Sequence, residues 1–215
     1  MADPIPRMTT VLVITGGDPV PASALDGLSD VDLVVAADSG LDHAEGLGIK
    51  PDVVVGDFDS VSVDALARFD GPVERHPVAK DATDLELALQ RAVEVGPDRI
   101  VVLGGHGGRL DHFLANALVL TTVPPGIVVE WRAGSATIHV VRTVIDLIGE
   151  KGDKVSLVPV GGDVSGVSTE GLRWPLSDAS LTSGSTLGVS NEFARPSASV
   201  EVGSGTLLVI VPGQS

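Results

Sequence analysis

The pattern of apolar segments changes once along the chain, and this change constrains the fold more than any other feature. Up to about Thr122, short apolar runs alternate with longer segments that have the apolar spacing of helices. The short runs predict strands at residues 11–15, 34–37, 53–55 and 100–103, and the longer segments predict helices at residues 41–47, 63–69, 84–95 and 111–120. Such alternation is typical of a parallel sheet covered by helices. We therefore expect an α/β, Rossmann-like amino-terminal domain over residues 1–124.

From Val123 onward the pattern is different. β-type runs lie between turns rich in Gly, Ser and Asp, and no segment predicts a helix. The runs are residues 127–131, 136–141, 154–160, 197–202 and 206–211. Because short strands separated by such turns are typical of all-β folds, we expect a carboxyl-terminal β-sandwich or jelly-roll domain over residues 125–215.

Composition and charge exclude several classes of protein. The 215 residues are 43% apolar, which is enough for a substantial core, and no apolar run approaches the ~20 residues of a membrane span. The chain has no cysteine, which excludes disulfides and thiolate metal sites. Its net charge of −15 argues against a nucleic-acid surface. With no amino-terminal segment of signal type, we expect a cytoplasmic protein without nucleic-acid or membrane partners.

Two acids follow the third predicted strand in the sequence Gly-Asp-Phe-Asp-Ser at residues 56–60. Ligands bind at the carboxyl edge of open α/β sheets. Since residues i and i+2 of an extended segment point the same way, Asp57 and Asp59 are expected to face one point. Two such charges repel unless a cation lies between them or a proton is shared. The alternative is a polar turn in which Ser60 or Asp59 caps the next helix.

Acids also follow the other predicted strands or begin the helices after them. Five acids in successive units predict one carboxylate cluster with a catalytic role: Asp38, Asp57, Asp59, Asp84 and Asp111. Hard oxygen ligands in a chain without cysteine favour magnesium over zinc.

The glycine-rich segment at residues 104–108 precedes another predicted helix. Its spacing is neither that of a P-loop nor that of the Gly-x-Gly-x-x-Gly fingerprint. Glycines let backbone N–H groups approach phosphate oxygens, and a helix start adds free N–H groups. Arg109 is placed to reach a phosphate with its fork of donors, and His106 within the segment and His112 just after it could contact a ligand. The alternative is a tight turn in which Asp111 is only a favourable first-turn acid.

At this point several motifs, in order, resemble those of the thiamine pyrophosphokinase family. They are Ala-Asp-Ser-Gly at 37–40, Gly-Asp-Phe-Asp-Ser at 56–60, Asp-Ala-Thr-Asp at 81–84 and Gly-Gly-Arg-Leu-Asp-His at 107–112. In the second half, Gly-Val-Ser-Thr-Glu-Gly-Leu-Arg-Trp-Pro-Leu at 166–176 and Gly-Val-Ser-Asn-Glu at 188–192 resemble the family's thiamine-binding domain. The resemblance covers nearly the whole chain. One departure is Ser39, where the family often has a second glycine.

The resemblance implies an enzyme that transfers the pyrophosphoryl group of ATP to the hydroxyl of thiamine, giving thiamine diphosphate and AMP. It implies a homodimer with active sites between subunits, and Mg²⁺ held by Asp57, Asp59 and Asp84, with Asp38 close by. The ATP-binding residues would be Lys80, Asp81, Thr83, Gly107, Gly108, Arg109, Asp111 and His112. The thiamine-binding residues would be Ser168, Thr169, Trp174, Ser190 and Asn191.

The chemistry of these residues is compatible with that reaction, because phosphoryl-type transfer needs positioning and charge neutralisation more than a covalent nucleophile. The sequence leaves open whether Asp38, Asp57 or Asp111 accepts the hydroxyl proton. Trp174 suits a stacked thiazolium cation, although it could also be a core or edge aromatic residue. Two other functions remain open: transfer to another alcohol such as a hydroxymethylpterin, and a non-catalytic nucleotide or metabolite sensor.

Overall fold

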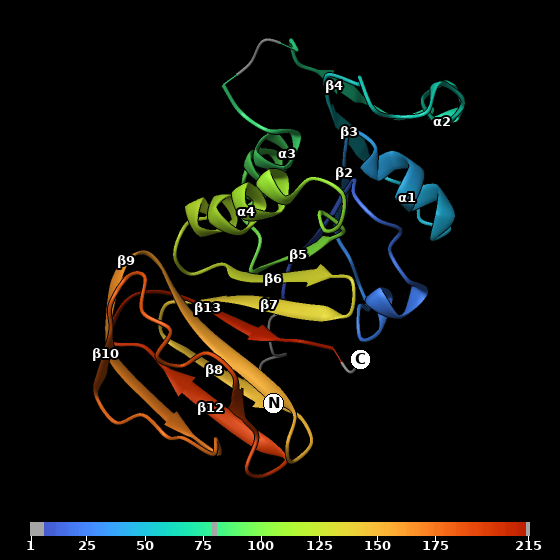
Figure 1. Ribbon diagram of the computed structural model, residues 1–215. Helices are drawn as coiled ribbons and strands as arrows, with labels where there is room; N and C mark the ends of the chain where they lie inside the picture. Colours follow the sequence, from blue (N-terminus) through green and yellow to red (C-terminus); the bar gives the residue numbers. More distant parts are fainter. Residues whose placement is uncertain (1–6, 79–80, 214–215) are drawn as a thin grey trace, which may run out of the picture.

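The amino-terminal half is built on parallel strands. The computed structural model describes residues 7–78 and 81–213 (Figure 1). The parallel strands are β1 (Thr10–Thr15), β2 (Leu33–Ala37), β3 (Val53–Gly56), β4 (Val73–Arg75), β5 (Arg99–Leu103) and β6 (Val128–Ala133). Their order is β4-β3-β2-β1-β5-β6, and every neighbouring pair is parallel. β1, β3 and β5 are buried on both faces, which explains their continuous apolar character, whereas β4 is a largely exposed edge strand.

Helices cover both faces of the parallel strands (Figure 1). They are α1 (Gly40–Gly46), α2 (Val63–Arg68), α3 (Asp84–Val93) and α4 (Leu110–Val119), with short 3-10 turns η1 (Ala22–Leu25) and η2 (Leu120–Thr122). The largest core lies under α3 and α4, where Phe113 packs on Trp131 of β6 with ring centroids 5.1 Å apart. Smaller cores lie under α1, α2 and η1 on the opposite face. The helix predictions are confirmed to within two residues at each end.

The carboxyl-terminal half is antiparallel. Its strands are β7 (Ala136–Val141), β8 (Val144–Ile148), β9 (Lys154–Glu170), β10 (Ala179–Leu181), β11 (Asn191–Glu192), β12 (Ser197–Glu201) and β13 (Ser204–Val211). One part of β9 pairs with β13 and its last residues pair with β12, so β9 belongs to two sheets. The second core lies between these sheets. An α/β part followed by a β-rich part is confirmed, and residues 123–213 contain no helix.

The two halves share one sheet rather than meeting at a loop. β6 is parallel to β5 and antiparallel to β7, and β7 pairs with β13. Side chains on β13 alternate between the cores: Leu207 and Val209 point into the second core, and Leu208 points into the first. The sheet therefore fixes one half against the other. The domain division after residue 124 stays a prediction.

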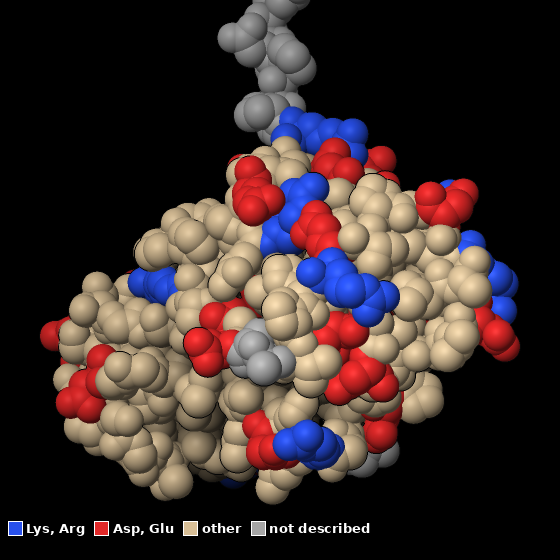
Figure 2. Space-filling view, turned by 90° about the horizontal axis from the view of Figure 1, so that it is seen from above, with Lys and Arg blue, Asp and Glu red and all other residues tan. Residues whose placement is uncertain are grey.

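Charged side chains are dispersed over one face of the molecule (Figure 2). Figure 2 shows Lys and Arg side chains in small groups among Asp and Glu on the face seen from above. No helix of the described residues is long and apolar enough to cross a membrane.

A largely buried ion network joins the strands on the η1 side. Glu130 of β6 accepts hydrogen bonds from Arg99 Nη2 at 2.5 Å and from Arg132 Nε at 2.6 Å. Arg132 Nη1 also donates to the carbonyl oxygens of Ala24 and Asp26. Burial by itself would raise the pKa of Glu130, but the two guanidinium groups lower it below its ordinary value. The network holds the η1 segment against β6.

We expect Glu130→Gln to destabilise the fold by about 3 kcal/mol, because it leaves two mostly buried guanidinium groups without a counter-charge. The free energy of unfolding in urea measures this. Glu170→Gln is the matched control, since Glu170 is 79% exposed and pairs with Arg195 at the surface. Its expected loss is below about 1 kcal/mol. Equal losses in the two variants would contradict a structural role for the network.

Candidate functional site

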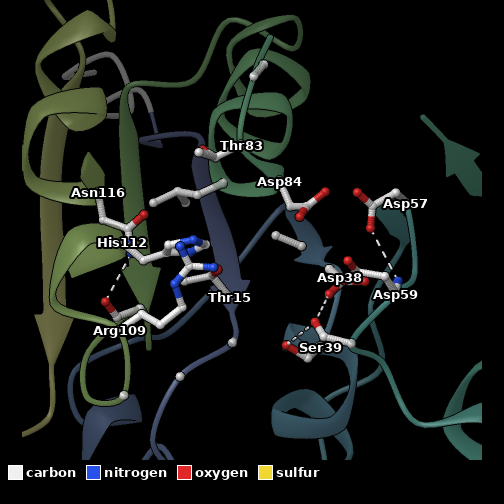
Figure 3. A pocket seen from close by; sticks show the side chains of 18 of the residues that line it. Thr15, Asp38, Ser39, Asp57, Asp59, Thr83, Asp84, Arg109, His112 and Asn116 are labelled. Atoms are coloured by element: carbon white, nitrogen blue, oxygen red, sulfur yellow. Dashed lines mark hydrogen bonds between the residues drawn. The ribbon is translucent and has the colours of Figure 1, made fainter. Parts of the chain in front are cut away.

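A pocket of about 490 Å³ lies at the carboxyl ends of the parallel strands. It is lined by the segments that follow β1, β2, β3 and β5 and by the first residues of α3 and α4 (Figure 3). The chain continues from β1 to β2 on one side and places β5 on the other, so the pocket sits at the switch point of the sheet. Open α/β sheets bind ligands at this position.

Three carboxylates converge on one side of the pocket. Asp38, Asp57 and Asp59 each offer an oxygen atom, and these atoms lie within 4.8 Å of one another (Figure 3). Asp38 is only 5% exposed. Its Oδ2 accepts a hydrogen bond from Ser60, whereas its Oδ1 is buried without a hydrogen-bond partner among the described residues. Burial raises the pKa of Asp38, and the nearby charges of Asp84 and Asp59 raise it further, against hydrogen bonds from Ser60 and Ser39.

Backbone turns, rather than an extended segment, bring these acids together. Phe58 lies in the left-handed region with φ of 65°, and the Asp59 N–H donates to Asp57 Oδ1 at 3.2 Å. The expectation that residues 57–59 are extended is therefore wrong, although both acids do face Asp38. The helix-cap alternative is also wrong, because Ser62 caps α2 by accepting from the Ala65 N–H.

Asp84 approaches the cluster from α3. Thr83 caps this helix by accepting from the Glu86 N–H at 3.2 Å, which places Asp84 in its first turn. A Cβ atom at Gly56 would lie 3.1 Å from Asp84 Oδ1 and 3.2 Å from Asp38 Cβ. A side chain at Gly56 would therefore press on both acids, and its φ of +153° is one that other residues rarely adopt. The structure groups Asp38 with Asp57 and Asp59, and places Asp84 beside them in the same pocket.

Two glycine-rich loops form the floor of the pocket between β1 and β5. They are residues 16–18 after β1 and residues 104–108 after β5. The Gly105 N–H donates to the Gly16 carbonyl at 2.6 Å, and the Asp18 N–H donates to the His106 carbonyl at 2.8 Å. The loops thus continue the pairing of β1 with β5 beyond the strand ends. The loop after β1 was predicted as a turn and not as part of the site. Its signal is Gly-Gly directly after a buried strand, as occurs after β5.

The start of α4 forms the opposite wall, with Arg109, His112 and Asn116 facing the pocket (Figure 3). Arg109 Nη2 donates to Asp111 Oδ2 at 2.5 Å, which holds the pKa of the Asp111 carboxyl at about 2. Asp111 does not line the pocket. It is therefore the least suited of the three acids left open as proton acceptors. Asn116, which donates to the Gly105 carbonyl at 3.0 Å, was not selected from the sequence because nothing marks it there.

The remaining residues expected near the nucleotide lie as follows. Thr83, Gly107 and Gly108 line the pocket, whereas Asp81 is exposed outside it. Lys80 lies outside the described residues.

Comparison with known proteins agrees with this geometry. The family model described as thiamin pyrophosphokinase, catalytic domain, matches residues 26–129, and that described as thiamin pyrophosphokinase, vitamin B1 binding domain, matches residues 137–207. Thiamine pyrophosphokinase of Bacillus subtilis (strain 168) is 30% identical over 210 residues, which cover 94% of this chain and 98% of that protein. The chain belongs to the thiamine pyrophosphokinase family.

Solved structures of the family have the same fold. The thiamine pyrophosphokinase from Bacillus subtilis has a TM-score of 0.84 at 30% identity, over 96% of this chain and all (100%) of that chain. The one from Geobacillus thermodenitrificans has a TM-score of 0.81 at 28% identity, over 96% and 99%. Yeast thiamin pyrophosphokinase has a TM-score of 0.76 at 16% identity, over 97% and 88%, which shows the fold alone.

The five residues that the family resemblance assigned to thiamine lie in the β-rich half, and none of them lines the pocket of the same chain. Trp174 is 51% exposed, with the Arg173 guanidinium carbon 4.8 Å from its ring centroid. Asn191 is buried, and its side-chain amide accepts from the Trp174 N–H and donates to the Trp174 carbonyl. Asn191 therefore holds the backbone that presents Trp174.

The other three form local hydrogen bonds. Thr169 Oγ1 accepts from the Leu176 N–H at 2.9 Å and Ser168 Oγ accepts from the Asp178 N–H at 3.1 Å. Ser190 has a φ of 59° and its N–H donates to Ser156 Oγ.

We expect Gly17→Ala to separate the two glycine-rich loops. The added Cβ would lie 2.4 Å from the His106 carbonyl oxygen, and Gly17 has a φ of +110°. The free energy of unfolding should fall by roughly 1–3 kcal/mol, and the KM for ATP should rise. Gly27→Ala is the control. Gly27 also has a positive φ, +71°, but no atom lies within 4 Å of the Cβ that alanine would add. A Gly17→Ala enzyme with an unchanged KM would contradict the role of this floor.

Proposed function

We propose that this chain is a Mg²⁺-dependent thiamine pyrophosphokinase that transfers the pyrophosphoryl group of ATP to the hydroxyl of thiamine and releases AMP. The observation that carries the proposal is the buried carboxylate of Asp38, whose Oδ1 has no hydrogen-bond partner among the described residues and which offers an oxygen within 4.8 Å of those of Asp57 and Asp59. The position of Asp38 at the ligand-binding edge of the sheet supports this function, and so does the family to which the chain belongs.

The acids fit a divalent cation of the hard type. A buried carboxylate oxygen without a partner is unfavourable, and three carboxylates this close repel one another. A cation bound by Asp38, Asp57 and Asp59, with Asp84 adjacent, removes both penalties, and oxygen ligands suit Mg²⁺. Bound Mg²⁺ would neutralise charge on the phosphate oxygens.

The opposite wall suits the phosphates of ATP. The glycine-rich loop and the start of α4 offer backbone N–H groups, and Arg109 offers a fork of donors. Arg109 pairs with Asp111 at the surface, where such a pair contributes little to stability. The guanidinium can therefore exchange the carboxylate for a phosphate. The pocket volume of about 490 Å³ lies within the range of small-molecule sites.

A second copy of the chain would complete the site. The thiamine residues proposed from the family resemblance do not line this pocket in their own chain, which supports a homodimer in which Trp174 faces the partner's acids. α4 carries an apolar stripe beside Arg109 and His112: Leu110, Leu114 and Leu118 are 71%, 57% and 56% exposed. Residues four apart lie on one helix face. We propose this stripe as part of the dimer contact, and a cytoplasmic location for the dimer.

The direct test of the proposed function is release of AMP from ATP with and without thiamine. We expect thiamine-dependent AMP release and a loss in turnover on the order of 100-fold for Asp59→Asn at saturating Mg²⁺, because neutralisation of phosphate charge acts mainly in the transition state. Asp64→Asn is the control, since Asp64 is an exposed acid on α2 outside the pocket. AMP release that depends on a hydroxymethylpterin would instead favour transfer to that alcohol. No AMP release with either alcohol would favour a non-catalytic nucleotide or metabolite sensor.

Mixing two defective variants tests the shared site. Asp59→Asn removes an acid from the pocket, and Trp174→Ala should weaken thiamine binding by roughly 1–2 kcal/mol if the ring stacks on the thiazolium. In a dimer with shared sites, some mixed dimers have one site with both residues native. We therefore expect activity at low thiamine to rise when the two variants are mixed and allowed to exchange subunits. An active monomer, or no rescue despite proven exchange, would contradict the shared site.

A further inference from the structure

The turn that carries two of the acids has an unfavourable backbone. Phe58, between Asp57 and Asp59, has a φ of 65°, which a bulky side chain rarely adopts. Its half-buried ring packs against the small core under α1 and α2. A residue stays in this region only where the surrounding contacts hold it there.

Arg75, the last residue of β4, supplies such contacts. Its guanidinium carbon lies 4.6 Å from the centroid of the Phe58 ring, and its Nη1 donates to the Asp57 carbonyl at 3.2 Å. In the β3–β4 pairing Arg75 stands opposite Gly56, and the next N–H, of His76, donates to the Gly56 carbonyl at 2.9 Å. The end of β4 thus contacts the turn at its backbone and at its aromatic ring. Arg75 itself does not line the pocket.

Repulsion among the carboxylates acts on the same turn. Asp38, Asp57 and Asp59 each bring one oxygen within 4.8 Å of the others, and like charges this close repel one another. We propose that Arg75 is a positioning residue, which holds Phe58 in the left-handed conformation so that Asp57 and Asp59 face Asp38 before a cation binds. This inference rests on the proposed cation site and names the residue that shapes it.

The test is Mn²⁺ binding to the free protein, measured from the electron paramagnetic resonance signal of unbound Mn²⁺. Arg75→Ala should weaken Mn²⁺ binding roughly tenfold, because residues that orient metal ligands have effects of this size. Arg75→Lys keeps the charge but loses the planar fork, so its affinity should remain below that of the wild type. Arg68→Ala is the control: Arg68 pairs with Glu45, away from the turn, and its loss should leave binding unchanged.

Testing Arg75→Ala in a Phe58→Gly variant separates a role of Arg75 in positioning the turn from general damage to the fold. Glycine adopts the left-handed region without a steric penalty, so Arg75→Ala should weaken Mn²⁺ binding less in Phe58→Gly than in the wild type. Circular dichroism and the unfolding midpoint verify that each variant is folded. An equal effect in both backgrounds, or wild-type affinity in Arg75→Lys, would overturn positioning by stacking.

The outcomes also distinguish this inference from the proposed function. If Asp59→Asn abolishes Mn²⁺ binding while Arg75→Ala leaves it unchanged, the cation site stands and the role of Arg75 is overturned. If the wild type does not bind Mn²⁺, or Asp59→Asn binds it as tightly, the cation site is overturned as well.

Discussion

The buried carboxylate of Asp38 is the constraint on which the rest of the site depends. Burial disfavours its charge, and neighbouring acids disfavour it further. The surrounding residues nevertheless bring more negative charge toward it: Ser60 holds one oxygen, and Gly56 leaves space for Asp84 beside it. Left-handed backbone at both Asp38 and Phe58 completes the arrangement. Strain and repulsion gathered at one point are typical of functional sites rather than of structural turns.

The continuous sheet explains how the two halves of the chain act together. Because side chains of β13 enter both cores, the β-rich half cannot rotate freely against the parallel strands. Trp174, held through its backbone by Asn191, is therefore presented in a fixed direction on a surface outside the pocket of its own chain. A rigid presentation of this kind suits a residue that serves a neighbouring copy.

β1, β2, β3 and β5 and the position of the acids could be predicted from the sequence, whereas the run at residues 127–131 was expected in the β-rich domain and instead forms β6, parallel to β5. Buried parallel strands are continuous apolar runs, and residues after them must lie at one edge, so Asp38, Asp57 and Asp59 were expected together. The exposed edge strand β8 and the length of β9 were not predicted. β9 runs through Gly161 and Gly162, whose φ values of 74° and 151° let the strand continue where the sequence resembles a turn.

Details of side-chain partners were beyond the sequence for a different reason. Asp111 turns to Arg109 and away from the pocket, Asn191 bonds to the Trp174 backbone, and Phe58 depends on Arg75 from another strand. Each of these depends on atoms distant in sequence or on a choice between two polar partners. Local spacing therefore indicated which residues lie near the pocket better than it indicated their hydrogen-bond partners.

The proposed cation site can be tested by locating a bound metal ion. Anomalous diffraction from crystals of the protein grown with Mn²⁺ and a non-hydrolysable ATP analogue would locate the ion without reference to activity. We expect an anomalous peak in contact with Asp38, Asp57 and Asp59, and analogue phosphates between that peak and Arg109. A peak elsewhere, or an analogue bound with these carboxylates uncoordinated, would contradict the proposed cation site.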